Sequence, residues 1–466
     1  MLKQTIDKIW DTRALPALMD FIRIPCKSTA FDPHWESNGY LNQACTFISA
    51  WVKQQLPQAS CEIIQEPGKT PCLWLDVPAY HAQTDNTVAF YGHLDKQPEA
   101  SGWSEGLGPW TPVIRDGKLF GRGCSDDGYS VFLMISALVS LREQGLGHPH
   151  CVGIFETQEE SGSIDLPHYL TALKERFNHP ISLFVLDNQC CDYQRLWLNT
   201  SLRGVISAVL RVKTLHHNVH SGTYSGILPD AFAIAQHLLS RIHEPLSGRV
   251  LLDSFHTQIP ENRKKQLLQA AKLLEASTSY YPPLLDGVQT KTTSVFDSIY
   301  NSTWEPALTV TAIDGLANLN QAANVVPKEI ALKLSIRIPP NIDLARAIQD
   351  LEKTVTQNVP FHASVTLEDI RQGSGWTPPL TAQNQETERL LNTCSQSVFH
   401  EDVAFSATGG SISIIPEFEK CLPGTSIMLL GVLGPGSNAH GPDESLNIEY
   451  VKKLTNVLSL YLKDVA

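Results

Sequence analysis

The sequence predicts an α/β domain with a mixed, largely parallel sheet, interrupted by an inserted α+β domain. Three observations support this prediction. Short apolar runs alternate with segments of helical spacing through residue 204, which is typical of a largely parallel sheet. Patterns of half-buried strands replace this alternation from residue 205, and helical spacing returns after residue 376. We therefore expect one domain of residues 1–204 and 377–466, and a second domain of residues 205–376.

The first domain opens with an amphipathic helix, because apolar side chains recur at helical intervals between Ile6 and Ile22. Four short apolar runs then predict buried strands, at residues 72–77, 87–91, 151–155 and 183–186. Helical spacing between these runs predicts helices at residues 129–143 and 166–176. Strands and helices that alternate in this way form an open α/β sheet.

The inserted domain is predicted from a different pattern. Residues 205–212 and 331–338 alternate between apolar and polar side chains, as half-buried strands do. One helix is expected after Asp230 and another at residues 344–355, and the glycine- and proline-rich residues 373–379 suggest a linker. Helical spacing at residues 387–397 and 448–462 then belongs to the first domain again.

Composition excludes some classes of partner. The 466 residues include 36 basic and 48 acidic ones, a formal net charge of −12, which argues against nucleic acid because phosphate binding needs a basic surface. The ten cysteines are scattered and form no CxxC pair, which favours reduced thiols in a cytoplasmic protein. The N-terminus has no apolar signal region and no stretch approaches 18 apolar residues, so no membrane partner is expected.

Side chains that can bind metals or move protons follow three of the four predicted strands. His93 and Asp95 follow the second strand, Glu159 and Glu160 the third, and Asp187 the fourth. Binding sites in open α/β sheets lie beyond the carboxyl ends of the strands. Each of these residues alone has an ordinary interpretation as a turn or surface residue, but together they predict a site at one edge of the sheet.

Two further motifs complete a set of possible metal ligands. Asp126 lies in a glycine-rich stretch before a predicted helix, where an aspartate is ordinarily an N-cap, and His440 lies in a glycine-rich loop. Two histidines and three carboxylates suffice for two divalent ions if Asp126 bridges them. The three carboxylates and a bridging hydroxide would balance the two ions, which favours deprotonation of bound water near neutral pH. Glu159 is then a spare carboxylate that could act as general base, and Asp95 could orient the ring of His93.

These motifs, in this order, resemble those of the zinc-dependent exopeptidases that include carnosinase, Cys-Gly dipeptidase, the carboxypeptidase G type, aminoacylase and succinyl-diaminopimelate desuccinylase. The resemblance covers nearly the whole chain. Two stretches of the inserted domain, residues 220–226 and 334–338, place it nearest the carnosinase-like branch. The resemblance implies a dimetal catalytic domain interrupted by a lid and dimerisation domain, and a homodimer formed through that lid.

The resemblance also implies a role for each metal-binding residue. His93 and Asp187 would bind one zinc ion, Glu160 and His440 the other, and Asp126 would bridge the two. The same family pattern implies a cis peptide bond after Asp126. The ligand set suits zinc, and manganese or cobalt would also accept it.

Further residues of the resemblance concern catalysis and the substrate. Glu159 would be the general base, and His220 would reach the scissile carbonyl, in this family often from the partner subunit of a dimer. The resemblance implies that Arg337 would bind the substrate carboxylate through paired hydrogen bonds. It also implies substrate contacts from Asn324, Gly410 and Ser411. Related dipeptidases often have an arginine before the Gly-Gly-Ser motif, where this chain has Ala407, so one source of positive charge is lost.

We therefore expect a dimetal-dependent hydrolase that cleaves the amide bond of dipeptides or C-terminal residues next to a free carboxylate. Metal-bound hydroxide would attack the carbonyl, with Glu159 as general base. The alternative enzyme is an N-acyl-amino-acid deacylase. Its substrate carries an acyl group, instead of a free amine, before the scissile bond. A non-catalytic relative is disfavoured because Glu159 and all five ligands are present.

Overall fold

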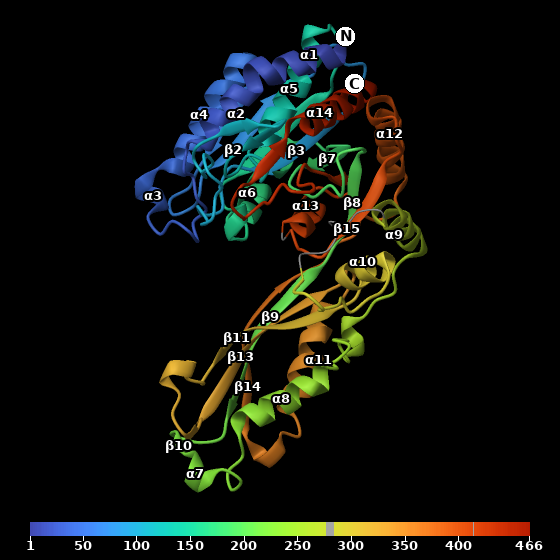
Figure 1. The fold of residues 1–466 in the computed structure, drawn as a ribbon. Helices are drawn as coiled ribbons and strands as arrows, with labels where there is room; N and C mark the ends of the chain where they lie inside the picture. The colour runs from blue at the N-terminus through green and yellow to red at the C-terminus, as the bar shows by residue number, and fades with distance from the viewer. Residues whose placement is uncertain (276–283, 413) are drawn as a thin grey trace. The chain divides into compact units, whose positions relative to one another are not determined.

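The computed structural model describes residues 1–275, 284–412 and 414–466. The chain divides into two compact units (Figure 1). The first unit comprises Met1–Thr200, Pro378–Ser406 and Ile414–Ala466, and the second comprises Ser201–Thr377 and Ala407–Ser413. The short segment at residue 407 thus belongs to the second unit, whereas the sequence-based boundaries assign it to the first domain.

An eight-stranded mixed sheet forms the centre of the first unit. Its strands, in spatial order, are β1 (Ser60–Ile64), β2 (Cys72–Val77), β6 (His150–Glu156), β3 (Thr87–His93), β7 (Ser182–Val185), β16 (Ser426–Leu429), β8 (Trp197–Leu202) and β15 (Ala404–Thr408). The central strands β6, β3, β7 and β16 run parallel, while β1, β2 and β8 pair antiparallel with their neighbours. The α/β fold with a mixed sheet is therefore confirmed.

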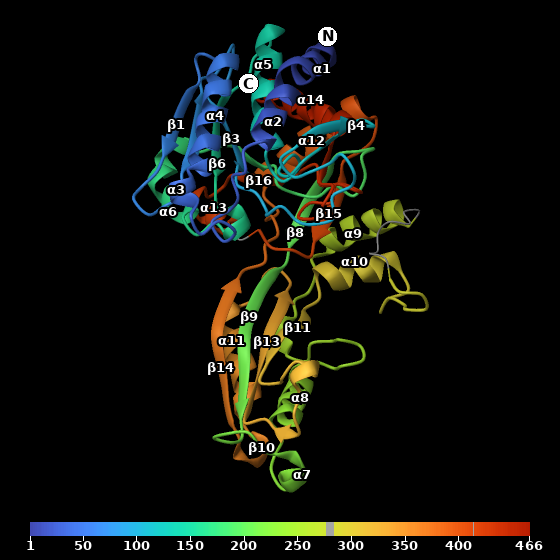
Figure 2. The same ribbon diagram turned by 60° about the vertical axis from the view of Figure 1, so that its left-hand side comes forward.

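Helices pack around this sheet (Figure 2). The longer ones are α1 (Leu2–Ile9), α2 (Leu15–Ile22), α4 (Tyr40–Gln55), α5 (Tyr129–Glu143), α6 (Leu166–Leu173), α12 (Ala382–Phe399) and α14 (Ile448–Asp464). Helix α5 has the predicted bounds and contacts α1, α4, α14 and strand β3. Its residues are buried without interruption from Tyr129 to Leu141, because it is apolar on every face. The expected N-terminal helix is present as α1 and α2, joined by a π-helical turn, Trp10–Ala14.

The second unit contains a four-stranded antiparallel sheet with two helices packed on it (Figures 1 and 2). The strands, in spatial order, are β11 (Ala307–Asp314), β13 (Glu329–Ile338), β9 (Gly204–Lys213) and β14 (Ser364–Gly373), and the helices are α8 (Ala231–Ile242) and α11 (Leu344–Thr356). Residues of β9 alternate between buried and half-buried, and the inward ones join the core formed with α8 and α11. Asp230 caps α8, since its Oδ1 accepts from the backbone N–H groups of Phe232 and Ala233 at 2.7 and 3.0 Å.

The segment predicted as a linker is ordered by backbone pairing. Strand β14 extends to Gly373, and Trp376 exchanges hydrogen bonds with Leu202 at 2.8 and 2.9 Å. The side chain of Trp376 is buried. The pairing with a residue distant in sequence places residues 373–377 in the second unit, and Pro378 begins the next segment of the first unit.

The structure also describes the state of the cysteines and the apolar character of the helices. All ten cysteines are free thiols. None of the helices in the described part of the chain has the combination of length and apolar character that a membrane span requires.

Packing at the centre of the second sheet yields a stability prediction. Leu210 on β9 is fully buried in the core of this unit. Replacing it with alanine should lower the free energy of unfolding by about 2–5 kcal/mol, because the substitution removes apolar contacts and leaves a cavity. Urea unfolding measures the change. The control is Leu319→Ala, whose side chain is 99% exposed and whose unfolding midpoint should match wild type. Equal midpoints for the two variants would show that β9 does not stabilise this unit.

Candidate active site

The carboxyl ends of three parallel strands bring the predicted site residues of the first unit together. His93 is the last residue of β3, and Asp187 lies two residues beyond the end of β7. Glu159 and Glu160 begin a short 3-10 turn that follows β6. Because β3 pairs in parallel with both β6 and β7, these chain segments emerge at the same edge of the sheet.

Asp126 lies between two imidazole rings. Its Oδ1 is 3.2 Å from Nε2 of His93, and its Oδ2 is 2.9 Å from Nε2 of His440. Asp187 Oδ2 lies 3.8 Å from the same nitrogen of His93, and Glu160 Oε2 lies 3.3 Å from that of His440. One carboxylate thus presents a separate oxygen to each histidine. The peptide bond between Asp126 and Asp127 is cis, which confirms the expectation from the family resemblance.

The side chains at this edge have the chemistry and spacing of a metal site. His93 with Glu159 and Asp187, and His93 with Asp126 and Glu160, each offer ligand atoms within 4.8 Å of one another. The side chain of Glu160 is 3% exposed, and its Oε1 is buried without a hydrogen-bond partner. A buried carboxylate oxygen is costly unless a donor or a cation satisfies it. Imidazole nitrogens and carboxylate oxygens are ligands that divalent transition metals accept, so the residues fit a metal centre.

Crowding of charged groups shifts the pKa values at this edge. Burial, followed by the negative charge of Asp126, raises the pKa of Asp187 to about 7. Burial and then Asp187 raise the pKa of Glu159 well above its usual range. Burial would also raise the pKa of Asp126, but hydrogen bonds with His440 and His93 hold it below its usual range. Hydrogen bonds with Asp126 and Glu160 raise the pKa of His440 to about 10. The raised pKa values show that the crowded carboxyl groups resist ionisation, and a cation bound between them would favour their ionised forms.

Asp95 connects two parts of the site. Its backbone carbonyl and its Oδ1 lie 3.1 and 3.4 Å from Nδ1 of His93. A proton held on Nδ1 leaves Nε2 as the nitrogen that can bind a metal, which is the tautomer a ligand requires. The carboxylate of Asp95 also accepts from the backbone N–H groups of Glu159 and Glu160 at 3.2 and 3.1 Å. Asp95 thus fixes the turn that presents these two glutamates.

The loop that contains Asp126 depends on Glu444, a residue that sequence analysis missed. The Glu444 carboxylate accepts from the backbone N–H groups of Gly123, Ser125 and Asp126 at 3.1, 3.1 and 3.3 Å. It also accepts from Nη1 of Arg122 at 2.7 Å, and the two side chains are 0% and 1% exposed. Because Glu444 lies far along the chain from this loop, only its proximity to His440 in the sequence could have suggested the role.

Gln97 is a second contact that sequence analysis missed. Its Nε2 donates to Oε2 of Glu160 at 2.5 Å. This bond holds the oxygen of Glu160 that also faces His440. Gln97 follows Asp95 in the chain by two residues, and this closeness to a predicted site residue was the one available signal.

The predicted substrate-binding residues and the predicted catalytic residue His220 lie in the second unit, where they form two groups. In one group, Nη1 of Arg337 on β13 donates to Oγ of Ser411 at 3.1 Å, next to Gly410. In the other, His220 on β10 (Val219–His220) pairs with Val325 on β12 (Val325–Val326), beside Asn324.

His220 and Asn324 are both exposed. The backbone N–H of Ser221 donates to the carbonyl oxygen of Asn324 at 2.9 Å, which joins the two segments. The catalytic role of His220 and the substrate contact of Asn324 stay predictions.

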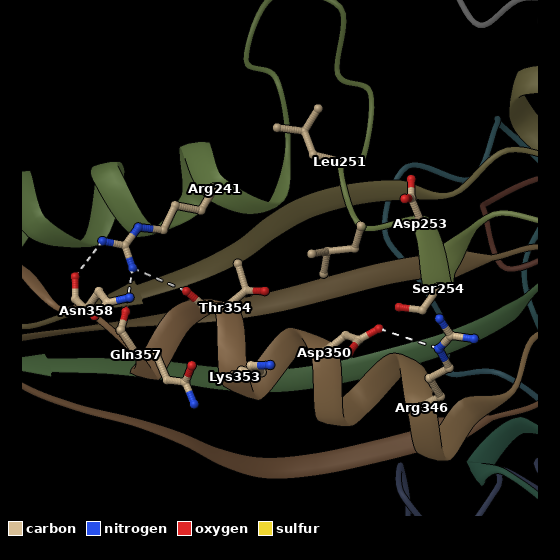
Figure 3. Close-up of a pocket in the computed structure, with 11 residues that line it drawn as sticks. Arg241, Leu251, Asp253, Ser254, Arg346, Asp350, Lys353, Thr354, Gln357 and Asn358 are labelled. Atoms are coloured by element: carbon tan, nitrogen blue, oxygen red, sulfur yellow. Dashed lines mark hydrogen bonds and ion pairs between the residues drawn. The ribbon is translucent and has the colours of Figure 1, made fainter.

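A surface cavity of about 690 Å³ in the second unit has a different character (Figure 3). It lies beside α8 and α11 and contains none of the predicted site residues. Arg241 at its rim donates to the backbone oxygens of Gln357 and Asn358 at 2.7 Å each and of Thr354 at 3.3 Å. These bonds cap the C-terminal end of α11, so the arginine is committed to structure.

Comparison with known proteins identifies relatives along most of the chain. The model of the family described as Peptidase family M20/M25/M40 matches residues 89–464. A cysteinylglycine-S-conjugate dipeptidase of Corynebacterium striatum is 26% identical over 419 residues, 86% of each chain. The Beta-Ala-His dipeptidase of Homo sapiens is 26% identical over 381 residues, 78% of this chain and 72% of the relative. The solved structure of the dipeptidase Dug1p from Saccharomyces cerevisiae shares the fold, with a TM-score of 0.75 at 23% identity over 99% of this chain and 97% of that one.

The contacts of Glu444 predict a large loss of stability when its carboxylate is removed. Glu444→Ala should lower the free energy of unfolding by about 3–5 kcal/mol, because Arg122 would stay buried without a counter-charge. The control is Glu386→Ala, which breaks an exposed ion pair with Arg389 and should leave the urea midpoint close to wild type. If both variants unfold at the wild-type urea concentration, the pair of Arg122 and Glu444 does not hold the loop.

Proposed function

Because this chain belongs to peptidase family M20/M25/M40, we propose that it is a dimetal-dependent dipeptidase that hydrolyses the amide bond next to a free carboxylate. The observation that carries the proposal is the position of Asp126, whose two oxygens lie 3.2 and 2.9 Å from Nε2 of His93 and His440. A shared carboxylate of this kind suits two adjacent cations. The names of the relatives, both dipeptidases, support the substrate class.

The proposed ligands divide between two divalent cations. His93 and Asp187 would hold one, Glu160 and His440 the other, and Asp126 would contact both. When bound, such cations supply Lewis acidity that polarises the substrate carbonyl and makes bound water more acidic. Zinc suits these ligands, as do manganese and cobalt.

Glu159 is the proposed general base. It lies outside the two proposed ligand sets, yet its turn is held beside them by the hydrogen bond from its own backbone N–H to Asp95. Its carboxylate would accept a proton from the attacking water and return it to the leaving amine. Asp95 acts here as a positioning residue, because it fixes both this turn and the ring of His93.

The remaining proposed residues recognise the substrate. Arg337 would bind the free carboxylate, with Ser411 and Gly410 beside it, because a guanidinium forms paired hydrogen bonds with a carboxylate. In a homodimer, His220 of one copy would stabilise the developing oxyanion in the site of the other.

Substrate preference tests the proposed function. Zinc-loaded protein should hydrolyse a panel of dipeptides with free C-terminal carboxylates, and the C-terminal amides of the same dipeptides should react at least about 100-fold more slowly, because a site built for a polar group discriminates strongly against its absence. Amine release measured by chromatography gives kcat/KM for each compound. N-acetyl amino acids are the comparison set. Faster hydrolysis of these compounds than of any dipeptide would identify a deacylase, and hydrolysis of neither would refute both activities.

Removal of the proposed base should separate catalysis from metal binding. Glu159→Ala should lower kcat by about 10²–10⁴-fold, the usual contribution of a general base, while metal analysis still finds about two ions per chain. The control is Glu36→Ala, an exposed glutamate whose loss should leave kcat within about twofold of wild type. Activity of Glu159→Ala within about tenfold of wild type would remove Glu159 from the mechanism.

A further inference from the structure

Two arginines of the second unit meet at the Gly-Gly-Ser loop. Arg203, between β8 and β9, donates from Nε to the carbonyl oxygen of Gly409 at 3.2 Å and from Nη1 to that of Glu305 at 3.3 Å. Arg337 donates from Nη1 to Oγ of Ser411 at 3.1 Å, and that hydroxyl donates to the backbone oxygen of Arg203 at 2.5 Å. Ser411 thus connects the two arginines.

The two guanidinium groups bring positive charge without a matching carboxylate. The ion pairs among the described residues of this unit include neither Arg203 nor Arg337. The nearby carboxylate of Glu305 instead lies 3.1 Å from Nδ1 of His256. Arg203 is 9% exposed, and burial together with the charge of Arg337 lowers the pKa of Arg203 to about 10. A nearly buried cation beside a like charge is unfavourable unless an anion compensates it.

Arg203 keeps hydrogen-bonding capacity for such an anion. A guanidinium has five N–H groups, and the bonds to Gly409 and Glu305 use two of them. The loop is also shaped around this side chain. A Cβ atom on Gly409 would lie 3.0 Å from Nη2 of Arg203 and 2.6 Å from the backbone oxygen of Ser302. Glycine at this position therefore lets the guanidinium lie directly against the loop.

We propose that Arg203 is a second cationic contact for the substrate carboxylate and, together with Arg337, determines the specificity for substrates that have one. This inference rests on the proposed function, since it assigns Arg203 to the same substrate group. A flat carboxylate with two oxygens matches two guanidinium groups that are linked through Ser411, one of which retains unused donors. On this assignment Arg203, between β8 and β9, supplies positive charge beside the loop in which Ala407 stands where related dipeptidases often have an arginine.

Kinetics with paired substrates test the assignment. The substrates are the dipeptide hydrolysed best by wild type and its C-terminal amide, with the metal-loaded full chain. Arg203→Met should lower the ratio of kcat/KM for the dipeptide to kcat/KM for the amide at least about tenfold, mainly through KM of the dipeptide, since the amide lacks the charge that Arg203 recognises. Arg203→Lys keeps the charge but loses the fork, so its ratio should fall by only about threefold.

Arg241→Met is the matched control for a structural effect. Arg241 also donates to backbone oxygens of the second unit, beside the surface cavity that Figure 3 shows. This variant should lose stability and keep the wild-type ratio of the two kcat/KM values. If Arg203→Met lowers both values by one common factor, Arg203 only holds the loop and the proposal is wrong.

Thermal unfolding in acetate gives a test that needs no turnover. Sodium acetate should raise the unfolding midpoint of wild type by about 1–3 °C over sodium chloride at equal ionic strength, because a bound anion stabilises the folded state. Arg203→Met should lose this rise and Arg241→Met should retain it. If Arg203→Met does not fold, Arg203→Lys takes its place in both experiments.

The two experiments separate the inference from the proposed function. A rise in acetate that depends on Arg203, in a protein that hydrolyses no dipeptide, would support the anion site and refute the dipeptidase. Dipeptide hydrolysis with an unchanged preference in both Arg203 variants would refute the inference alone.

Discussion

Repulsion among buried carboxylates is the constraint on which the first unit depends. Asp126, Glu160 and Asp187 lie close around two imidazole rings, where side chains of like charge would move apart if they were free to do so. Two further carboxylates prevent this by accepting from the backbone. Asp95 holds the turn at Glu160, and Glu444 holds the loop at Asp126. The unfavourable charge arrangement is thus maintained by hydrogen bonds that do not involve the crowded oxygens, and divalent cations match it.

Local sequence patterns were sufficient to predict the elements whose burial follows one regular pattern along their whole length. Helix α5 has the predicted bounds because every face of it is apolar, and β9 alternates as predicted because one face of its sheet meets two helices. The prediction that polar side chains would gather at one sheet edge follows from strand order, since residues after parallel neighbours must emerge together. The family resemblance added the cis peptide bond at Asp126, which no spacing argument could have supplied.

Contacts between distant positions lay beyond this kind of reasoning. Glu444 has the sequence context of a surface loop, but it is buried against Arg122. The two residues are too far apart in the sequence for a local pattern to relate them. Trp376 lies in a stretch rich in glycine and proline, yet it pairs with Leu202 because the chain returns there from β14. Arg203 shares this difficulty: its neighbours Gly409 and Glu305 come from separate segments. In each case the deciding interaction is a long-range hydrogen bond that composition and periodicity do not encode.

The order of the strands also bears on how the protein forms during synthesis. All four strands of the second sheet lie between residues 204 and 373, so the ribosome delivers them as one continuous stretch. The first sheet instead cannot be completed until β16 has been synthesised. This strand pairs with both β7 and β8, and it follows all strands of the second sheet in the chain. Until then β7 has an open edge, and open strand edges invite pairing with other chains. The nascent chain therefore passes through a stage in which all strands of the second sheet have been made while the first sheet still has an open strand edge.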